Sequence, residues 1–259
     1  MSSSDNAPLR VIVTGGNGGI GGAIIRQYLA AGSDVVSIDC AGDAPEGAFC
    51  VCADISLRDD VERAFAEIDR RWSHVAPDVF VGCAAVSRPA HLLDMRLEDF
   101  EEMLAINVRG TFLTTQAAAR RMAKAKRGAI VLISSVAAQQ AWAQEAGYSA
   151  TKAATSSLAQ GFAVDLAPFG ISVNAVAPGP IEHGSRSMAA TRTDPEVFRH
   201  EIERTPMARL GGPEEVAQTV FRLAGAPWVT GQVLAVDGGF MATGLGYFGA
   251  ARDRLMSAQ

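Results

Sequence analysis

The chain has 259 residues, of which 48% are hydrophobic and 20% are charged, and its formal net charge is −5. This length and hydrophobic content suffice for a well-buried core, in one large α/β domain or in two small ones. The net negative charge does not favour binding to DNA or RNA. No apolar run reaches the roughly 18 residues that span a bilayer. Neither a nucleic-acid partner nor a membrane partner is therefore expected.

Residues 1–8 are polar and lack the basic and apolar regions of a secretion signal, so a disordered N-terminal arm is expected there. The four cysteines, Cys40, Cys50, Cys52 and Cys83, do not have the spacing of a zinc site. Buried thiols are expected, with no metal site and no disulfide, and thiols of this kind indicate the cytoplasm.

From residue 9 onward, apolar β-type runs alternate with helical patterns. The predicted strands cover residues 9–14, 34–39, 49–53, 79–83, 129–134, 171–175 and 233–236. The predicted helices cover residues 21–31, 57–72, 97–125, 148–167 and 213–224. Near-continuous apolar strands separated by helices indicate a parallel sheet that is covered on both faces. The prediction is an α/β fold in which residues 9–259 form a single domain with a doubly wound, Rossmann-type parallel sheet of about seven strands.

Two segments interrupt the alternation. Residues 40–48 are too few for a comfortable crossover helix, so a loop or a single turn is predicted there. Residues 181–212 form a long insertion rich in polar and helix-forming residues. Such insertions are often lids over substrate sites, although a plain surface excursion is the alternative.

A glycine-rich turn, TGGNGGIG at residues 14–21, joins the first predicted strand to the first helix. Glycines let backbone N–H groups approach a pyrophosphate closely, and the helix N-terminus adds positive potential. Asp39 ends the second predicted strand, where a carboxylate can accept both ribose hydroxyls and would repel a 2′-phosphate. The turn contains no Lys or Arg and Cys40 follows Asp39, so NAD is expected rather than NADP. Asp54 is expected either at the adenine edge or as a helix cap.

Five motifs together resemble the short-chain dehydrogenase/reductase family, within it the single-domain subclass of about this length. They are TGGNGGIG at 14–21, INVRG around Asn107, LISS ending at Ser135, YSATK at 148–152 and APGP at 177–180. The resemblance extends over almost the whole chain, through PMARLGGPEEVA at 206–217 and TGQVLAVDGG at 230–239. It implies hydride transfer between a nicotinamide cofactor and an alcohol or a ketone.

Tyr148 and Lys152 are four residues apart and share one face of the predicted helix. A lysine ammonium favours the phenolate and so lowers a tyrosine pKa toward working pH. By resemblance, Tyr148 is the general acid/base, Ser135 hydrogen-bonds the substrate oxygen, and Lys152 also holds the cofactor ribose. Family spacing selects Ser135 over Ser134 for this role. Asn107 matches the asparagine that holds a water linking the lysine to solvent.

The residues expected to bind the cofactor are Gly15, Asn17, Gly19, Ile20, Gly21, Asp39, Asp54, Ile55, Ala84, Tyr148, Lys152, Pro178, Gly179, Ile181 and His183. The chain departs from the family pattern twice. Residues 82–85 read GCAA where the family usually has Asn-Asn-Ala-Gly, which leaves the rigidity of this turn in question. His183 stands where the family often has a threonine, and it either replaces that donor, faces the substrate or lies in a lid.

Signals for the substrate are few. The wall between Ser135 and Tyr148 is mostly apolar or amide, with Trp142 and Gln144 as candidate contacts and Glu145 as its only charge. Arg88 is either a site for a substrate carboxylate or an ordinary surface arginine, and the same holds for Arg186.

Three functions are compatible with these motifs. The first is an NAD-dependent dehydrogenase of a secondary alcohol, such as a cyclic alcohol, a diol or a polyol. The second is an NADPH-dependent 3-oxoacyl-thioester (acyl-carrier-protein) reductase, and the third is a dinucleotide-binding sensor without catalysis. By resemblance, a homotetramer assembled through the helices at 97–125 and 148–167 is also expected.

Overall fold

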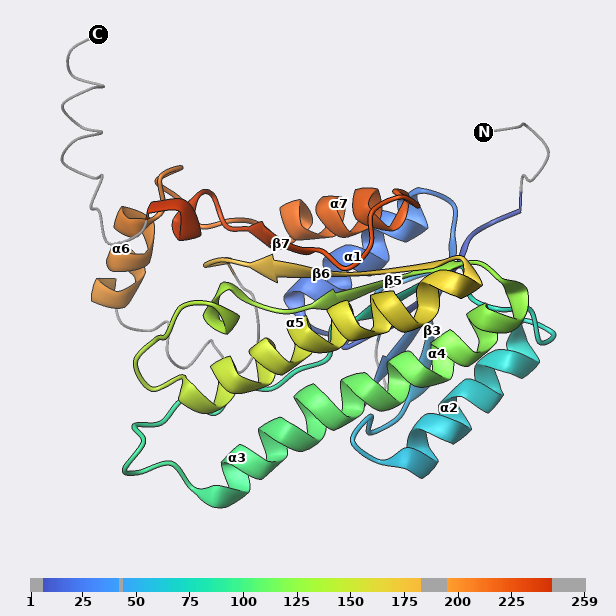
Figure 1. The fold of residues 1–259 in the computed structure, drawn as a ribbon, viewed down its shortest axis with the longest axis horizontal. Helices are drawn as coiled ribbons and strands as arrows, with labels where there is room; N and C mark the ends of the chain where they lie inside the picture. Colours follow the sequence, from blue (N-terminus) through green and yellow to red (C-terminus); the bar gives the residue numbers. More distant parts are fainter. Residues whose placement is uncertain (1–6, 42–43, 183–194, 244–259) are drawn as a thin grey trace, which may run out of the picture.

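Seven parallel strands form the centre of the molecule (Figure 1). The structure, a computed structural model, describes residues 7–41, 44–182 and 195–243. The strands are β1 Arg10–Thr14, β2 Asp34–Asp39, β3 Phe49–Cys52, β4 Val79–Gly82, β5 Gly128–Ile133, β6 Ile171–Pro178 and β7 Val233–Val236. Their order across the sheet is β3-β2-β1-β4-β5-β6-β7. The predicted doubly wound parallel sheet is thereby confirmed.

Helices cover both faces of the sheet. They are α1 Gly19–Ala30, α2 Arg58–Arg71, α3 Leu97–Met103, α4 Thr111–Ala125, α5 Ala146–Leu166, α6 Pro195–Arg204 and α7 Pro213–Ala224, with shorter segments η1 Leu104–Gly110, η2 Val136–Ala138, η3 Ala167–Phe169 and η5 Phe240–Thr243. Helices α1 and α7 lie on one face, and α2, α4 and α5 on the other (Figure 1). Successive strand residues point to opposite faces, so Val11 and Val13 pack with α1 and α7 while Ile12 packs on the other side.

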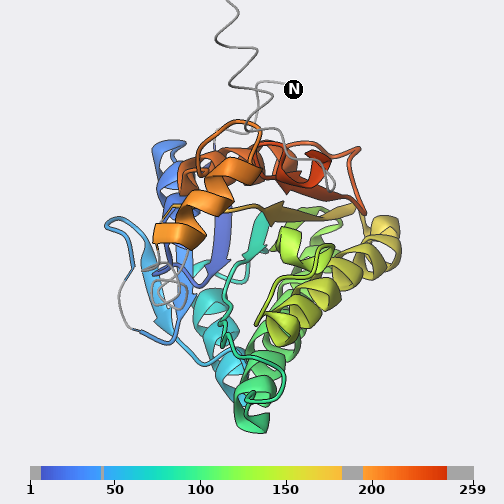
Figure 2. The same ribbon diagram turned by 90° about the vertical axis from the view of Figure 1, so that its left-hand side faces the viewer.

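The chain reverses its direction across the sheet at β1, which pairs with β2 on one side and with β4 on the other. Connections leaving the carboxyl ends of β1 and β4 therefore diverge, and a crevice opens between them. Figure 2 looks onto this carboxyl edge, with α6 (orange) in front of its upper part. The fold thus predicts a ligand site at this edge before any side chain is considered.

The single helix predicted over 97–125 is interrupted by a π-helical segment, η1, which separates α3 from α4. The Thr111 hydroxyl donates to the carbonyl of Asn107 over 2.7 Å, and the Thr114 hydroxyl donates to the carbonyl of Gly110 over 2.8 Å. These side-chain bonds satisfy carbonyls in the widened turns. π-Helical turns are frequent at functional sites, and this one carries Asn107.

Other predicted elements agree with the structure within a few residues. Strand β6 continues to Pro178 beyond its predicted end at 175, and all eight of its residues are buried. In the described part of 40–48 the chain makes a turn, in which Ala48 N–H donates to the carbonyl of Pro45. Helix α6 lies inside the predicted lid, 181–212. Residues 1–6, His183 and Arg186 lie outside the described residues.

The expected burial of all four cysteines is wrong. Cys40 and Cys52 are exposed, and Cys50 and Cys83 are partly exposed. Strand β3 is short and lies at the edge of the sheet, so side chains near its end reach solvent. In the described ranges no helix is long and apolar enough to cross a membrane.

Candidate active site

A cavity of about 600 Å³ lies at the carboxyl edge of the sheet. Its walls come from the glycine turn, the ends of β2 to β6, the segment around Ser135, the first turn of α5, and α6. The cavity therefore occupies the crevice that the reversal of the chain at β1 opens.

The glycine turn packs too tightly for side chains. Gly15 has a φ of +72°, and a Cβ there would lie 2.7 Å from Cα of Ala84. A Cβ on Gly21 would overlap the carbonyl oxygen of Gly15. Both positions require glycine, and the turn brings backbone N–H groups and the start of α1 to the cavity wall. This cradle fits the pyrophosphate of a dinucleotide.

Asp39 is held in place at the end of β2. One carboxylate oxygen accepts the N–H of Asn17 over 3.1 Å, and the other accepts the N–H of Ala41 over 3.2 Å. The amide of Asn17 in turn donates to the carbonyl of Ala41 over 2.9 Å. The oxygen bonded to Ala41 also accepts the thiol of Cys40 over 3.7 Å, and the oxygen bonded to Asn17 keeps a second lone pair that a ribose hydroxyl can use.

The turn after β4 is anchored from β1. The Thr14 hydroxyl oxygen accepts the N–H of Cys83 over 3.0 Å and the N–H of Ala84 over 3.2 Å. Cys83 and Ala84 line the cavity. The family's asparagine pair is missing from this turn, and the two hydrogen bonds to Thr14 fix the turn to β1 in its absence.

The two serines after β5 have different surroundings. The Ser134 hydroxyl bonds to the carbonyl of Lys152 over 3.0 Å and to the hydroxyl of Ser156 over 2.7 Å, which holds α5 against the strand. The Ser135 hydroxyl oxygen accepts the N–H of Ala137 over 3.1 Å. That bond uses a lone pair of Ser135 and leaves its O–H to donate toward the cavity.

Lys152 lies beside Tyr148 on α5 and is only 3% exposed. Its Nζ donates to the carbonyl of Ile133 over 2.8 Å and lies 5.6 Å from the centre of the Tyr148 ring. Burial lowers the pKa of Lys152 to about 8, an effect that the nearby Cys83 partly opposes. The ammonium has two further N–H groups, which can hold a ribose.

Asn107 joins two parts of the site through hydrogen bonds to residues other than Lys152. Its amide oxygen accepts the N–H of Val86 over 2.8 Å, and its amide nitrogen donates to the carbonyl of Val86 and to the hydroxyl of Thr151. These bonds position the loop after β4 against the helix that carries the tyrosine and the lysine. The role of Asn107 in holding a water remains a prediction.

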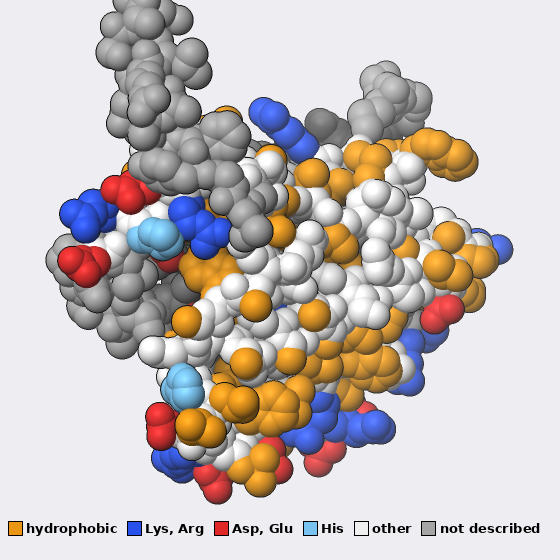
Figure 3. Space-filling model, turned by 60° about the vertical axis from the view of Figure 1, so that its left-hand side comes forward, with side chains coloured by type: hydrophobic (Ala, Val, Ile, Leu, Met, Phe, Trp, Pro, Cys, Tyr) orange, Lys and Arg blue, Asp and Glu red, His pale blue; other side chains and the backbone are white. Residues whose placement is uncertain are grey.

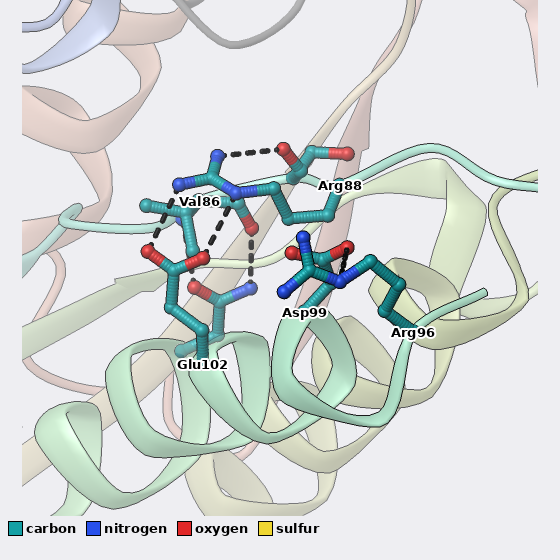
Figure 4. Close-up of polar contacts among 7 residues, drawn as sticks. Val86, Arg88, Arg96, Asp99 and Glu102 are labelled. Carbon is teal, nitrogen blue, oxygen red and sulfur yellow. Dashed lines mark hydrogen bonds and ion pairs between the residues drawn. The ribbon is translucent and has the colours of Figure 1, made fainter.

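Arg88 lies at the cavity wall, and its guanidinium is engaged by Glu102 of α3 (Figure 4). Two of its nitrogens contact the Glu102 carboxylate at 2.8 and 2.9 Å, and a third donates to the carbonyl of Ser87. Because Glu102 already neutralises the positive charge of Arg88, this arginine is not available to pair with a substrate carboxylate.

The cavity brings together most of the residues predicted from the sequence. They are Gly15, Asn17, Ile20, Gly21, Asp39, Asp54, Ile55, Ala84, Arg88, Ser135, Trp142, Tyr148, Lys152, Pro178, Gly179 and Ile181. Asp54 lines the cavity, and its carboxylate accepts the N–H of Ser56 in the turn before α2. The helix-cap alternative is wrong, because the N-cap residue of α2 is Leu57 and no side chain caps that helix. Gly19, Asn107 and Gln144 are not lining residues, and Gln144 is exposed.

Other polar residues that line the cavity were not among the predicted site residues, among them Ser87, Ser134, Glu145 and Glu201. Glu145 had a usable signal, since it precedes Tyr148 by three residues, about one helical turn. Glu201 had no such sequence signal, because it lies on α6 in the long insertion and only the tertiary structure brings it to the cavity.

Comparison with known proteins agrees with this geometry. A profile described as Enoyl-(Acyl carrier protein) reductase, from the short-chain dehydrogenase/reductases, matches residues 15–241. The chain belongs to the short-chain dehydrogenase/reductase family, whose members are oxidoreductases that bind a nicotinamide dinucleotide.

Among curated relatives, the 3-oxoacyl-[acyl-carrier-protein] reductase MabA of Mycobacterium avium is 36% identical over 231 residues, covering 88% of each chain. The 3-oxoacyl-[acyl-carrier-protein] reductase FabG of Aquifex aeolicus is 36% identical over 242 residues, covering 88% of this chain and 95% of FabG. Among solved structures, a gluconate 5-dehydrogenase from Burkholderia cenocepacia, in complex with NADP and tartrate, superposes with a TM-score of 0.85 at 30% identity, covering 90% of this chain and 95% of that one.

Proposed function

We propose that the protein is an NAD-dependent oxidoreductase that interconverts a secondary alcohol and a ketone. The observation that carries this proposal is one cavity lined by Ser135, Tyr148 and Lys152 at one end and by Asp39 at the other. Strands β2 and β5 are three strand spacings apart, or about 14 Å, a separation suited to a dinucleotide lying across the sheet edge.

The proposed chemistry divides between the cofactor and the side chains. When bound, the nicotinamide supplies the hydride acceptor or donor. The Tyr148 hydroxyl removes the proton from the alcohol, or returns it to the oxygen in the reverse reaction. Ser135 donates its O–H to the same oxygen and stabilises the negative charge that develops there. Lys152 provides a cation beside Tyr148 and N–H groups for the ribose.

Asp39 supports NAD as the cofactor. A fixed carboxylate accepts hydrogen bonds from both ribose hydroxyls, whereas it repels a 2′-phosphate. The two backbone N–H groups from Asn17 and Ala41 hold it in that position. Against this stands the gluconate 5-dehydrogenase relative, which was solved with NADP.

A second candidate is the NADPH-dependent reduction of a 3-oxoacyl thioester, which the names of the MabA and FabG relatives favour. Parallel assays separate the two candidates. Secondary alcohols with NAD and a 3-oxoacyl thioester with NADPH are offered to the same preparation, and NADH and NADPH binding is followed by fluorescence. Turnover with NAD and tighter NADH binding support the first candidate. Thioester reduction with tighter NADPH binding overturns it.

Binding of NADH without turnover on any alcohol or ketone would instead favour the third function, a sensor. Its weakness is that the chain keeps the tyrosine, the lysine and the serine of the reaction in one cavity. The cytoplasmic location remains a prediction.

A homotetramer remains a proposal. Several large apolar side chains on the helices expected to pair are exposed, among them Phe112 of α4 and Val164 of α5. Hydrophobic side chains also gather on the lower half of the face drawn in Figure 3. Light scattering tests the proposal: Val164→Arg should convert tetramers to smaller species, and a monomeric wild type would contradict it.

A further inference from the structure

The cavity wall near Tyr148 carries two carboxylates, Glu145 from the turn before α5 and Glu201 from α6. We infer that this end of the cavity binds a neutral polyhydroxylated substrate, with Glu145 and Glu201 accepting hydrogen bonds from its hydroxyl groups. The inference rests on the proposed function and narrows its substrate class.

The segments that carry the two glutamates pack against the same ring. Phe240, which is 2% exposed, stacks on Trp142 with 5.4 Å between the ring centres, and the guanidinium of Arg204 lies 4.7 Å above it. Arg204 is three residues after Glu201 on α6. Glu145 N–H donates to the carbonyl of Trp142 over 3.3 Å. Phe240 therefore joins the two walls, and both carboxylates belong to one substrate compartment.

The cavity also contains buried donors. Ser87 is 3% exposed and lines the cavity, and its hydroxyl has no hydrogen-bond partner among the described residues. The indole N–H of Trp142, another lining residue, is also buried without a partner there. Buried polar groups are normally paired, so these two donors indicate that a bound molecule supplies acceptors.

The charges disfavour an anionic substrate. Among the described lining residues the basic side chains are Arg88 and Lys152. Arg88 is paired with Glu102, and Lys152 is placed beside Tyr148 for the reaction itself. A substrate carboxylate would therefore meet two carboxylates, while the guanidinium of Arg204 lies over the Phe240 ring and is not among the lining groups. Hydroxyl groups suit the site better, because each one donates to a carboxylate and accepts from Ser87 or Trp142.

Matched substrates test the inference. Sorbitol, xylitol and erythritol are compared, with NAD, against their aldonates, their amino analogues and the monohydric 2-alkanols of equal chain length. We expect kcat/KM for the best polyol to exceed that of its aldonate and of the 2-alkanol by roughly tenfold or more, as expected for hydrogen bonds to charged groups. A preference for the aldonate or for the amine would overturn the inference.

Isosteric variants assign the preference to the two carboxylates. Glu145→Gln and Glu201→Gln should each lower the ratio of polyol to 2-alkanol kcat/KM by roughly tenfold, chiefly through KM. Glu203→Gln, on the exposed side of α6, is the matched control and should leave the ratio unchanged. NADH binding verifies that each variant is folded. An unchanged ratio in both cavity variants would overturn the inference.

The outcomes also separate the inference from the function on which it rests. Turnover of 2-alkanols with NAD, without a gain for polyols, would reject the polyol class and leave the dehydrogenase intact. Reduction of a 3-oxoacyl thioester with NADPH as the only turnover would reject the dehydrogenase itself.

Discussion

Lys152 donates a hydrogen bond to the carbonyl of Ile133 over 2.8 Å, which ties a buried ammonium on α5 to the carboxyl end of β5. The hydroxyl of Ser134, one residue further along, bonds to the carbonyl of Lys152 itself. The strand that ends at the serines and the helix that carries Tyr148 are thereby held in fixed register. The site depends on these contacts between β5 and α5, because Ser135 and Tyr148 must reach the same substrate oxygen.

The low pKa of Lys152 predicts a pH-dependent difference in stability. Burial lowers the pKa from 10.5 to about 8, so between these values the unfolded chain holds a proton that the folded chain has released. The free energy of unfolding of the cofactor-free protein, relative to Lys152→Met, should therefore rise by up to about 3 kcal/mol as pH rises through this window. Denaturant titrations of both proteins at several pH values measure this difference.

The exposed Lys124→Met is the control for this measurement, because a solvated lysine has no comparable desolvation penalty. If the difference in free energy of unfolding between the wild type and Lys152→Met stays constant between pH 7 and pH 10, burial does not destabilise the Lys152 ammonium in the folded protein.

Replacement of Asp39 should change the choice of cofactor. Asp39→Asn removes the negative charge and weakens the bonds to the ribose, so NADH affinity should fall by roughly tenfold to 100-fold while NADPH affinity falls less or increases. Fluorescence titrations with both cofactors give the ratio. Asp59→Asn on the exposed start of α2 should leave it unchanged. Equal losses for both cofactors would show that Asp39 only supports the glycine turn.

The glycine turn should tolerate no side chain at its closest approach. A methyl group on Gly21 would overlap the carbonyl of Gly15, so Gly21→Ala should displace the turn and weaken NADH binding by roughly tenfold or more. Gly225→Ala, whose added methyl would meet only ordinary contacts of 3.5 Å and longer, is the control. Full NADH affinity in Gly21→Ala would contradict the cradle assigned to this turn.

Thr14 should be important for stability as well as for binding. Thr14→Val removes the acceptor of two backbone N–H groups, at Cys83 and Ala84, and should lower the free energy of unfolding by about 1–3 kcal/mol. Thr14→Ser keeps the hydroxyl and should restore most of the loss. If Val and Ser replacements are equally stable in denaturant titrations, Thr14 does not anchor the turn after β4.

The layered architecture could be predicted because its signals are local. Apolar runs fit strands buried on both sides, and the range 213–224 predicted for α7 equals the observed one, where Gly212, Pro213 and Glu215 mark the helix start. The π-helical turns around Asn107 had no such signal, and neither had the bonds of its amide to the backbone of Val86, which lies on a loop distant in sequence.

The residues of the candidate site also differ in whether a local sequence signal predicts them. The glycine turn, Asp39, Ser135, Tyr148 and Lys152 occur in short motifs, and all of them line the cavity, the turn through Gly15, Asn17, Gly18, Ile20 and Gly21. Glu201 reaches the same cavity only through tertiary packing, so no spacing in the sequence indicated it, whereas Ser87 lies between the predicted Ala84 and Arg88. The exposure of Cys52 likewise depends on the edge position of β3, which strand order decides and sequence pattern does not, and Cys40 lies outside the sheet in the turn after β2.

The most direct test of the account is NAD-dependent oxidation of secondary alcohols by the wild type and by Tyr148→Phe, followed by NADH absorbance. The phenylalanine keeps the ring and removes only the hydroxyl that exchanges the proton. The account predicts that the wild type forms NADH and that Tyr148→Phe binds NADH normally but loses about 100-fold or more in kcat. Wild-type rates in Tyr148→Phe would contradict it, because the proton would then be handled by another group.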